Sequence, residues 1–345
     1  MEKIAFICDE VFIYWSTIIL ALAALTAMVT YAAVYIRKGG DLFSLSLSIL
    51  LALILSIIIA RLAHWYCQAD AYASFGAAMT DYSQGGFGLM GVFFGCLLTA
   101  GVLRLIDLCQ NLPVMLDAMA IGGGLGIAVG RLASLFNSSD RGAAVPDSWG
   151  LPFACPVVNV VSGVQENRLA TVMIRSILVG AIVAGLVIYM LLSARRNRKL
   201  QDGDICLMFL LMYGAVQIVC DSTRYDSMFL RSNRFVSLVQ ILGLVALLIP
   251  LVVFSVRMVM RSGFKWGYLA VWVGILGMMG LAGYMEYYVQ RNGDQAVLAY
   301  SVMSAALIVI VSLGLLIRWL AVRCIRFETV ISSSEEEAGE TGAKG

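Results

Sequence analysis

Residues 42–66 read LFSLSLSILLALILSIIIARLAHWY, and the part before Arg61 contains no charged side chain. About 20 consecutive apolar residues cross the hydrocarbon of a bilayer as a helix, whereas a strand needs only roughly 9–11. Backbone polar groups in lipid must also be satisfied within the spanning segment, as they are in a helix. This stretch therefore predicts a transmembrane α-helix.

The rest of the chain repeats the pattern. Hydrophobic residues make up 61% of the 345 residues, charged residues make up 13%, and the mean hydropathy is +0.88. A soluble domain has roughly 45–50% apolar and about 25% charged residues. The candidate spans are 11–36, 42–66, 85–106, 113–134, 169–194, 205–223, 235–257, 267–289 and 297–318. We expect an all-α integral membrane protein with about nine transmembrane helices.

Basic residues set the expected orientation. In a nine-span arrangement they gather on one side, at 37–38, 195–199, 257–265 and 318–326. Because positively charged loops tend to stay in the cytoplasm, the N-terminus is expected outside and the C-terminus inside. The one substantial outer loop is then 135–168, which is long enough to cover a site.

Several kinds of ligand are excluded by the composition. The formal charge is +2, and no basic stripe with interleaved aromatic residues occurs, so no nucleic-acid partner is expected. The chain has one histidine, His64, and no CxxC motif, so no metal site is expected. No GK[ST] follows the glycines at 122–126, which argues against a phosphate-binding loop and favours close helix packing. No cofactor is predicted.

Two polar stripes lie at the predicted outer ends of spans. Arg131, Ser134 and Asn137 have a spacing of three residues and share one face if the helix continues. A guanidinium beside a hydroxyl and an amide suits a phosphate or carboxylate, although a helix end bound to its own loop has the same pattern. The second stripe comprises Gln217, Asp221 and Arg224, whose simpler interpretation is a local ion pair.

Two further outer ends carry unusual residues. A charge at the centre of a membrane helix costs roughly 2.5–3.5 kcal/mol, so Arg61 either extends to the interface or serves a site. Gln84, Gly85 and Gly86 lie at the start of a predicted helix that is rich in glycine. Each glycine destabilises a helix by about 1 kcal/mol relative to alanine. Arg175 adds another charge at similar depth. Together these ends predict one outward-facing polar site inside the bundle.

In its order along the chain, this set of residues resembles the prolipoprotein diacylglyceryl transferase family. The resemblance rests on Ala60-Arg61, Gln84-Gly85-Gly86, Asp117, Gly130-Arg131, Asn137, Gly142, Tyr213-Gly214, Asp221, Arg224 and Gln240. It implies a seven-helix enzyme of the bacterial plasma (cytoplasmic) membrane. Such an enzyme moves a diacylglyceryl group from phosphatidylglycerol to the lipobox cysteine in the signal peptide of a prolipoprotein.

The resemblance also implies a domain division. It covers roughly residues 10–257, so we expect a transferase-like membrane domain at 1–257 and two additional helices within 258–320. Residues 321–345, which include three consecutive glutamates, are expected to form a disordered cytoplasmic tail.

The roles implied by the resemblance fall into two groups. Arg131 and Arg224 would hold the lipid phosphate and Asp221 would orient an arginine, so these three are the expected catalytic residues. The expected substrate-binding residues are Gln84, Gly85, Gly86, Asn137, Gly142, Arg61, Ser134 and Gln217.

The chain departs from the family pattern at several positions. Met90 stands where the family has a histidine, and Gln217 stands where it has an arginine. Ser134 replaces an asparagine, and Ser138 and Ser139 replace a Gly-Glu pair. Two alternatives therefore stay open: an altered relative that binds phospholipid or peptide without this catalysis, and an unrelated small-molecule transporter.

Overall fold

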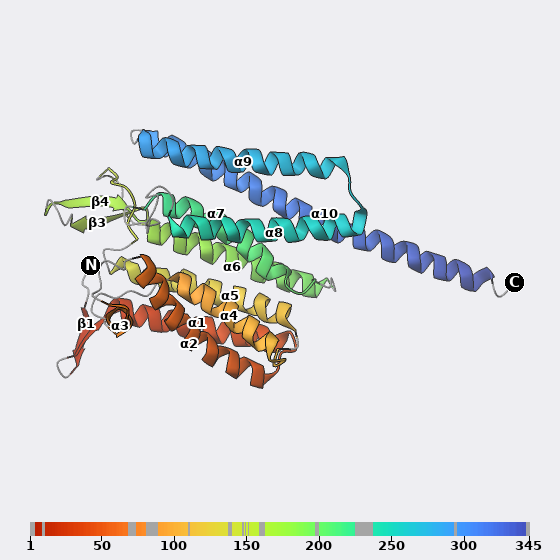
Figure 1. The fold of residues 1–345 in the computed structure, drawn as a ribbon, viewed down its shortest axis with the longest axis horizontal. Coiled ribbons are helices and arrows are strands. Elements are labelled where there is room, and N and C mark those ends of the chain that lie inside the picture. The colour runs from red at the N-terminus through yellow and green to blue at the C-terminus, as the bar shows by residue number, and fades with distance from the viewer. Residues whose placement is uncertain are drawn as a thin grey trace. The chain divides into compact units, whose positions relative to one another are not determined.

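The structure, a computed structural model, describes residues 4–8, 11–67, 74–80, 89–109, 111–136, 140–146, 148, 150, 152–158, 163–196, 200–224, 237–292 and 295–342. Long apolar helices dominate it (Figure 1). They are α1 (Trp15–Arg37), α2 (Leu42–Cys67), α4 (Leu89–Leu105), α5 (Leu112–Arg131), α6 (Thr171–Arg195), α7 (Asp204–Ser222), α8 (Leu238–Ser262), α9 (Trp266–Arg291) and α10 (Ala296–Gly342). Two short elements, α3 (Phe75–Thr80) and the 3-10 helix η2 (Leu132–Leu135), join them.

The predicted all-α membrane fold is confirmed. Among the described residues, 8 helices are long and apolar enough to cross a membrane, and the apolar part of α4, Gly91–Leu105, is shorter. The predicted third span began at residue 85, and residues 81–88 lie outside the described part of the chain. The chain is a multi-pass membrane protein.

Two hairpins stand where the sequence predicted a helix start and a loop. β1 (Ile4–Cys8) pairs antiparallel with β2 (Val11–Tyr14), so the first span begins at Trp15 rather than at residue 11. β-branched and aromatic side chains dominate β2, and such residues favour strands. In the predicted outer loop, β3 (Ala154–Val158) pairs antiparallel with β4 (Gln165–Leu169).

The chain divides into two compact units, Met1–Gly243 and Leu244–Gly345, and α8 begins in the first and continues in the second. Within the second unit α9 packs against α10. The backbone of α10 is helical to Gly342, where the sequence predicted a disordered tail. Glutamate and alanine are good helix formers, and extending an existing helix avoids the nucleation cost. The domain boundary at residue 257 stays a prediction.

Helix α5 lies at the centre of the first unit, against α1, α6 and α7, while α2 packs with α4. Its glycines let α1 approach closely, as predicted: a Cβ on Gly122 would lie 2.7 Å from the carbonyl oxygen of Ala27. Gly130, further along α5, faces the earlier residue Ala23, so the two helices are antiparallel. Arg131 therefore lies at the end of the bundle where α1 begins, and Arg37 lies at the opposite end.

A buried carboxylate ties the opposite end together. Asp117 accepts hydrogen bonds from Lys38 Nζ at 2.5 Å and from the backbone N–H groups of Gly203 at 3.0 Å and Cys206 at 2.9 Å. These amides belong to the start of α7, where the helix dipole favours a negative charge. Asp117 thus joins α1, α5 and α7 far from Arg131.

Candidate functional site

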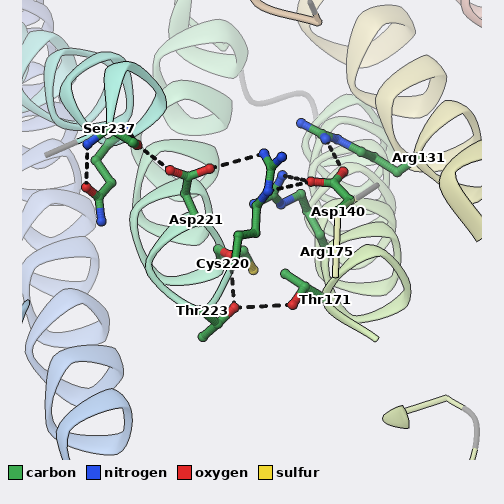
Figure 2. Close-up of polar contacts among 10 residues, drawn as sticks. Arg131, Asp140, Thr171, Arg175, Cys220, Asp221, Thr223 and Ser237 are labelled. Carbon is green, nitrogen blue, oxygen red and sulfur yellow. Dashed lines mark hydrogen bonds and ion pairs between the residues drawn. The ribbon is translucent and has the colours of Figure 1, made fainter. Parts of the chain in front are cut away.

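Three arginines meet where α5 ends, α6 begins and α7 ends. Arg131 is the last residue of α5, Arg175 lies one turn inside α6, and Arg224 follows the end of α7. These helices pack on one another, which brings three arginines that are far apart in the sequence to one end of the first unit. Figure 2 shows Arg131 and Arg175 directed toward the carboxylate of Asp140.

Asp140 is the centre of this arginine cluster. Its Oδ1 forms ion pairs with Arg224 Nε at 2.9 Å and with Arg175 Nη1 at 3.5 Å, and its Oδ2 pairs with Arg131 Nη1. The residue is only 3% exposed. Burial by itself would raise the pKa of this carboxyl, but the three guanidinium groups outweigh it and lower the pKa to about 2. Asp140 is therefore an anion that compensates the mutual repulsion of the arginines.

A second carboxylate extends the network toward α8. Asp221 pairs with Arg224 Nη1 at 3.3 Å and accepts a hydrogen bond from Ser237 Oγ (Figure 2). Ser237 is in turn held by Gln240, whose Oε1 accepts from the Ser237 backbone N–H at 3.0 Å. Arg224 is thus shared between two carboxylates, and three guanidiniums facing two carboxylates leave one formal positive charge.

Several donors of this cluster have no acceptor among the described residues. Nε of Arg131 and both Nε and Nη2 of Arg175 are buried without a hydrogen-bond partner there. The amide of Gln217, one turn before Asp221 on α7, is 1% exposed and likewise without a partner at Nε2 or Oε1 in the described part of the chain. Leaving a buried polar group unpaired costs roughly 1–3 kcal/mol, and more if it is charged. Such an arrangement suits an oxygen-rich anion, because guanidinium groups bind phosphate with strong, paired hydrogen bonds.

Gly142 closes the loop that carries Asp140. Its backbone N–H donates to Leu169 O at 2.9 Å, and it forms an isolated β-bridge with Arg224. A Cβ at this position would lie 2.7 Å from Oγ1 of Thr171. The glycine thus allows the loop to pack on the start of α6 and positions the cluster through its backbone.

Two predicted site residues lie outside the cluster contacts described above. Ser134 is in η2, and its carbonyl oxygen accepts from Arg141 Nη2 at 3.4 Å, so this turn binds its own loop. Arg61 is 3% exposed, but it lies on α2, which packs with α4 rather than with α6 and α7. Four other predicted binding residues, Gln84, Gly85, Gly86 and Asn137, lie outside the described residues.

The structure therefore places the three predicted catalytic residues in one cluster, which also contains Asp140 and Arg175. Asp140 was missed, although it directly follows the two serines that stand where the family pattern has Gly-Glu. The sequence identifies Arg175 as a charge at similar depth and Gln240 as part of the family resemblance, but neither is among the predicted site residues. The local ion pair of Asp221 with Arg224 is present, and Arg224 lies beyond the end of α7 rather than on the same helical stripe.

Comparison with known proteins points to the same family as the site residues. The family model described as prolipoprotein diacylglyceryl transferase matches residues 3–254. A phosphatidylglycerol–prolipoprotein diacylglyceryl transferase of Finegoldia magna is 23% identical over 251 residues, which cover 71% of this chain and 93% of the relative. Relatives with the same name from Clostridioides difficile and Streptococcus pyogenes serotype M1 are 23% and 27% identical to this chain. Both alignments cover 71% of this chain, and they cover 92% and 93% of the two relatives. The chain belongs to the prolipoprotein diacylglyceryl transferase family.

Proposed function

We propose that this protein transfers a diacylglyceryl group from phosphatidylglycerol to the lipobox cysteine in the signal peptide of a prolipoprotein, and that the arginine cluster holds the lipid phosphate. The observation that carries the assignment of the site is the set of buried guanidinium N–H groups of Arg131 and Arg175 that have no acceptor among the described residues. The phosphate of phosphatidylglycerol supplies acceptor oxygens, and the positive charge left over in the cluster favours an anion.

The reaction makes two chemical demands. The sulfur of the cysteine attacks the glycerol carbon that bears the phosphate, the carbon–oxygen bond breaks, and glycerol phosphate leaves with the electron pair. Hydrogen-bond donors fixed around the leaving phosphate stabilise the charge that develops there. Arg131, Arg175 and Arg224 supply such donors, and Asp221 orients Arg224 at 3.3 Å.

The acceptor thiol must also lose its proton, since the thiolate is the nucleophile and a free thiol has a pKa near 8.5. Asp140 is a poor base at neutral pH, because an efficient base has a pKa near the working pH and that of Asp140 is lowered to about 2. Met90 cannot accept a proton. We assign thiolate stabilisation to the positive charge of the cluster and give Asp140 a positioning role.

The site and the membrane topology belong together in this proposal. The residues of the cluster lie at the predicted outer ends of their spans, so we place the end of the bundle with Arg131 outside and the last turns of α1 and α6 at the cytoplasm. The positively charged loops at 37–38 and 195–199 support this orientation. The protein then resides in the bacterial plasma membrane with its N-terminus outside.

The decisive test is transfer of labelled diacylglyceryl from phosphatidylglycerol to a lipobox peptide by purified protein in detergent. Arg131→Ala is expected to lower the rate by about 10²–10³, the usual loss of one transition-state donor. Arg104→Ala is the matched control, because Arg104 lies on α4 with its side chain 54% exposed. The proposal fails if wild type and Arg131→Ala transfer label equally.

The second candidate is a relative that binds the lipid without this catalysis, which Met90 and Gln217 favour because they replace a family histidine and arginine. It predicts no transfer by the wild type together with phosphatidylglycerol binding that Arg131→Ala abolishes. Lipid binding measured on the same two proteins separates the candidates.

A further inference from the structure

A groove opens at the end of the first unit that lies opposite the arginine cluster. One cavity of about 530 Å³ is lined by Arg37, Ile188, Leu191, Leu192, Ala194 and Arg195. A second, of about 250 Å³, shares Arg37, Leu191 and Ala194 with the first. The cavities therefore adjoin as one groove between the last turn of α1 and the last turns of α6.

The groove is a membrane thickness away from the proposed transfer site. Arg175, in the cluster, and Arg195, in the groove, both lie on α6. At 1.5 Å per residue their separation along the helix is about 30 Å, which matches the hydrocarbon core of a bilayer. A ligand of the groove thus belongs to the opposite leaflet or to the solvent beyond it.

The lining of the groove combines apolar and cationic side chains. Ile188, Leu191 and Leu192 are 56%, 39% and 47% exposed on α6. Arg37 and Arg195 also line the groove and are exposed, and neither has an ion pair within the described ranges. Such a surface matches an amphipathic anion, since guanidinium groups bind phosphate oxygens in pairs.

The remaining charges of the groove are already engaged. Lys38 Nζ lies 2.5 Å from buried Asp117 and 3.9 Å from Asp202. Asp202 also accepts from Asn111 Nδ2 at 3.4 Å. The two arginines are thus the groups left to bind a phosphate in the groove.

We propose that this groove binds an anionic phospholipid of the leaflet opposite to the arginine cluster, with its phosphate between Arg37 and Arg195 and an acyl chain along Ile188, Leu191 and Leu192. A volume of about 530 Å³ lies in the range of small-ligand sites, roughly 300–1,000 Å³. The apolar side chains favour a lipid over free phosphate, because free phosphate has no apolar part to pack against them. The inference does not depend on the proposed function.

The test uses the full chain in detergent with Arg131→Gln, so that the cluster at the other end does not bind the probe. Thermal unfolding is followed against dioctanoyl phosphatidic acid, dioctanoyl phosphatidylcholine and inorganic phosphate, because a ligand that binds the folded state raises the Tm. Phosphatidic acid is expected to raise the Tm. The double variant Arg37→Gln with Arg195→Gln is expected to increase the half-saturating concentration of phosphatidic acid at least about tenfold, because the loss of one charge-assisted hydrogen bond is enough for that factor. Arg196→Gln is the matched control, because this exposed neighbour lies outside the groove lining, and it should leave the value unchanged.

Three outcomes overturn the proposal. If the double variant and its parent have the same half-saturating concentration of phosphatidic acid, the two arginines do not bind it. If phosphatidylcholine raises the Tm as much as phosphatidic acid does, only the apolar part of the lipid is bound. If inorganic phosphate raises the Tm as much, the groove binds a free anion and not a lipid. Arg37→Gln and Arg195→Gln are also measured singly, so that a folding defect of the double variant does not decide the result.

Discussion

At the scale of single residues, Asp140 holds the arginine cluster together. It is buried, pairs with three arginines and has a φ of +61°, a left-handed conformation uncommon for residues other than glycine. Its carboxylate allows three guanidiniums to lie close together. Removing it should therefore separate or expose them.

Asp140→Asn is expected to destabilise the fold by about 3–5 kcal/mol, the usual effect of breaking a buried ion pair, and to lower the transfer rate. Thermal unfolding in detergent and the labelled-lipid assay measure the two effects. Asp107→Asn is a closely matched control, because Asp107 also has a positive φ of 54° but its side chain is 91% exposed. If both variants lose equal stability, the backbone conformation rather than the arginine cluster explains the effect.

The same carboxylate predicts how stability depends on pH. Its pKa is lowered from 3.8 to about 2 on folding, so it stabilises the folded state above pH 3.8, and this contribution disappears as the pH falls toward 2. The difference corresponds to about 2 kcal/mol. Unfolding measured at pH 5 and at pH 2.5 should show a loss in the wild type that is absent in Asp140→Asn; an identical loss in both would assign it to other groups.

Gln217 offers a test in which stability and activity move in opposite directions. Its amide is buried and has no hydrogen-bond partner among the described residues. Gln217→Leu should stabilise the protein by about 1–3 kcal/mol by removing this unpaired group. If the amide binds substrate, KM for phosphatidylglycerol should rise about tenfold, as expected for one lost hydrogen bond. Higher stability with an unchanged KM would make Gln217 a packing residue only.

At the scale of secondary-structure elements, the contact between α1 and α5 positions Arg131. Glycines on α5 allow this contact: a Cβ on Gly122 would lie 2.7 Å from the carbonyl oxygen of Ala27 and 2.8 Å from the backbone nitrogen of Tyr31. Both atoms belong to the backbone of α1, which cannot yield as a flexible side chain does. The helices would have to move apart.

Gly122→Ala is therefore expected to cost about 1–3 kcal/mol through overpacking and to reduce transfer by displacing the end of α5. Gly123→Ala is the control on the same helix, since nothing lies within 4 Å of its Cβ position. That variant should be neutral or more stable by up to about 1 kcal/mol, because alanine favours the helix. Unfolding of both variants in detergent checks the pair, and equal losses would contradict the close-contact interpretation.

At the scale of the whole molecule, the family match ends at residue 254, whereas α8 continues to Ser262. Helices α9 and α10 begin at Trp266 and Ala296, so both lie beyond the part of the chain that the family model matches. We propose that α9 and α10 are not needed for the transfer chemistry.

A chain ending at Ser262 is expected to keep the transfer activity within a few-fold of the full protein, because the arginine cluster is complete before residue 244. The measurement is the labelled-lipid assay on both chains at equal amounts of folded protein, with Arg131→Ala in the short chain as the inactive reference. A folded short chain that binds lipid but transfers none would show that α9 and α10 contribute to catalysis.

The sequence alone predicted the all-α membrane fold, the approximate bounds of most membrane helices and the family. Hydropathy is a local property, because each helix satisfies its own backbone in lipid and must be apolar over about 20 residues. Residues 42–66 were predicted as a span, and α2 covers Leu42–Cys67. The hairpins at β2 and β3 were less predictable, since short apolar runs suit strands and helices alike.

Only the tertiary structure decided how the site is made. Arg131, Arg175 and Arg224 come from three helices, and nothing in their spacing shows that all three meet one carboxylate. Asp140 lies in a connection without regular structure, where neither helical periodicity nor strand alternation predicts the direction of a side chain. Ion pairs form between residues that are far apart in the sequence. The local sequence therefore indicates which charges in the membrane need partners, and helix packing decides which partners they find.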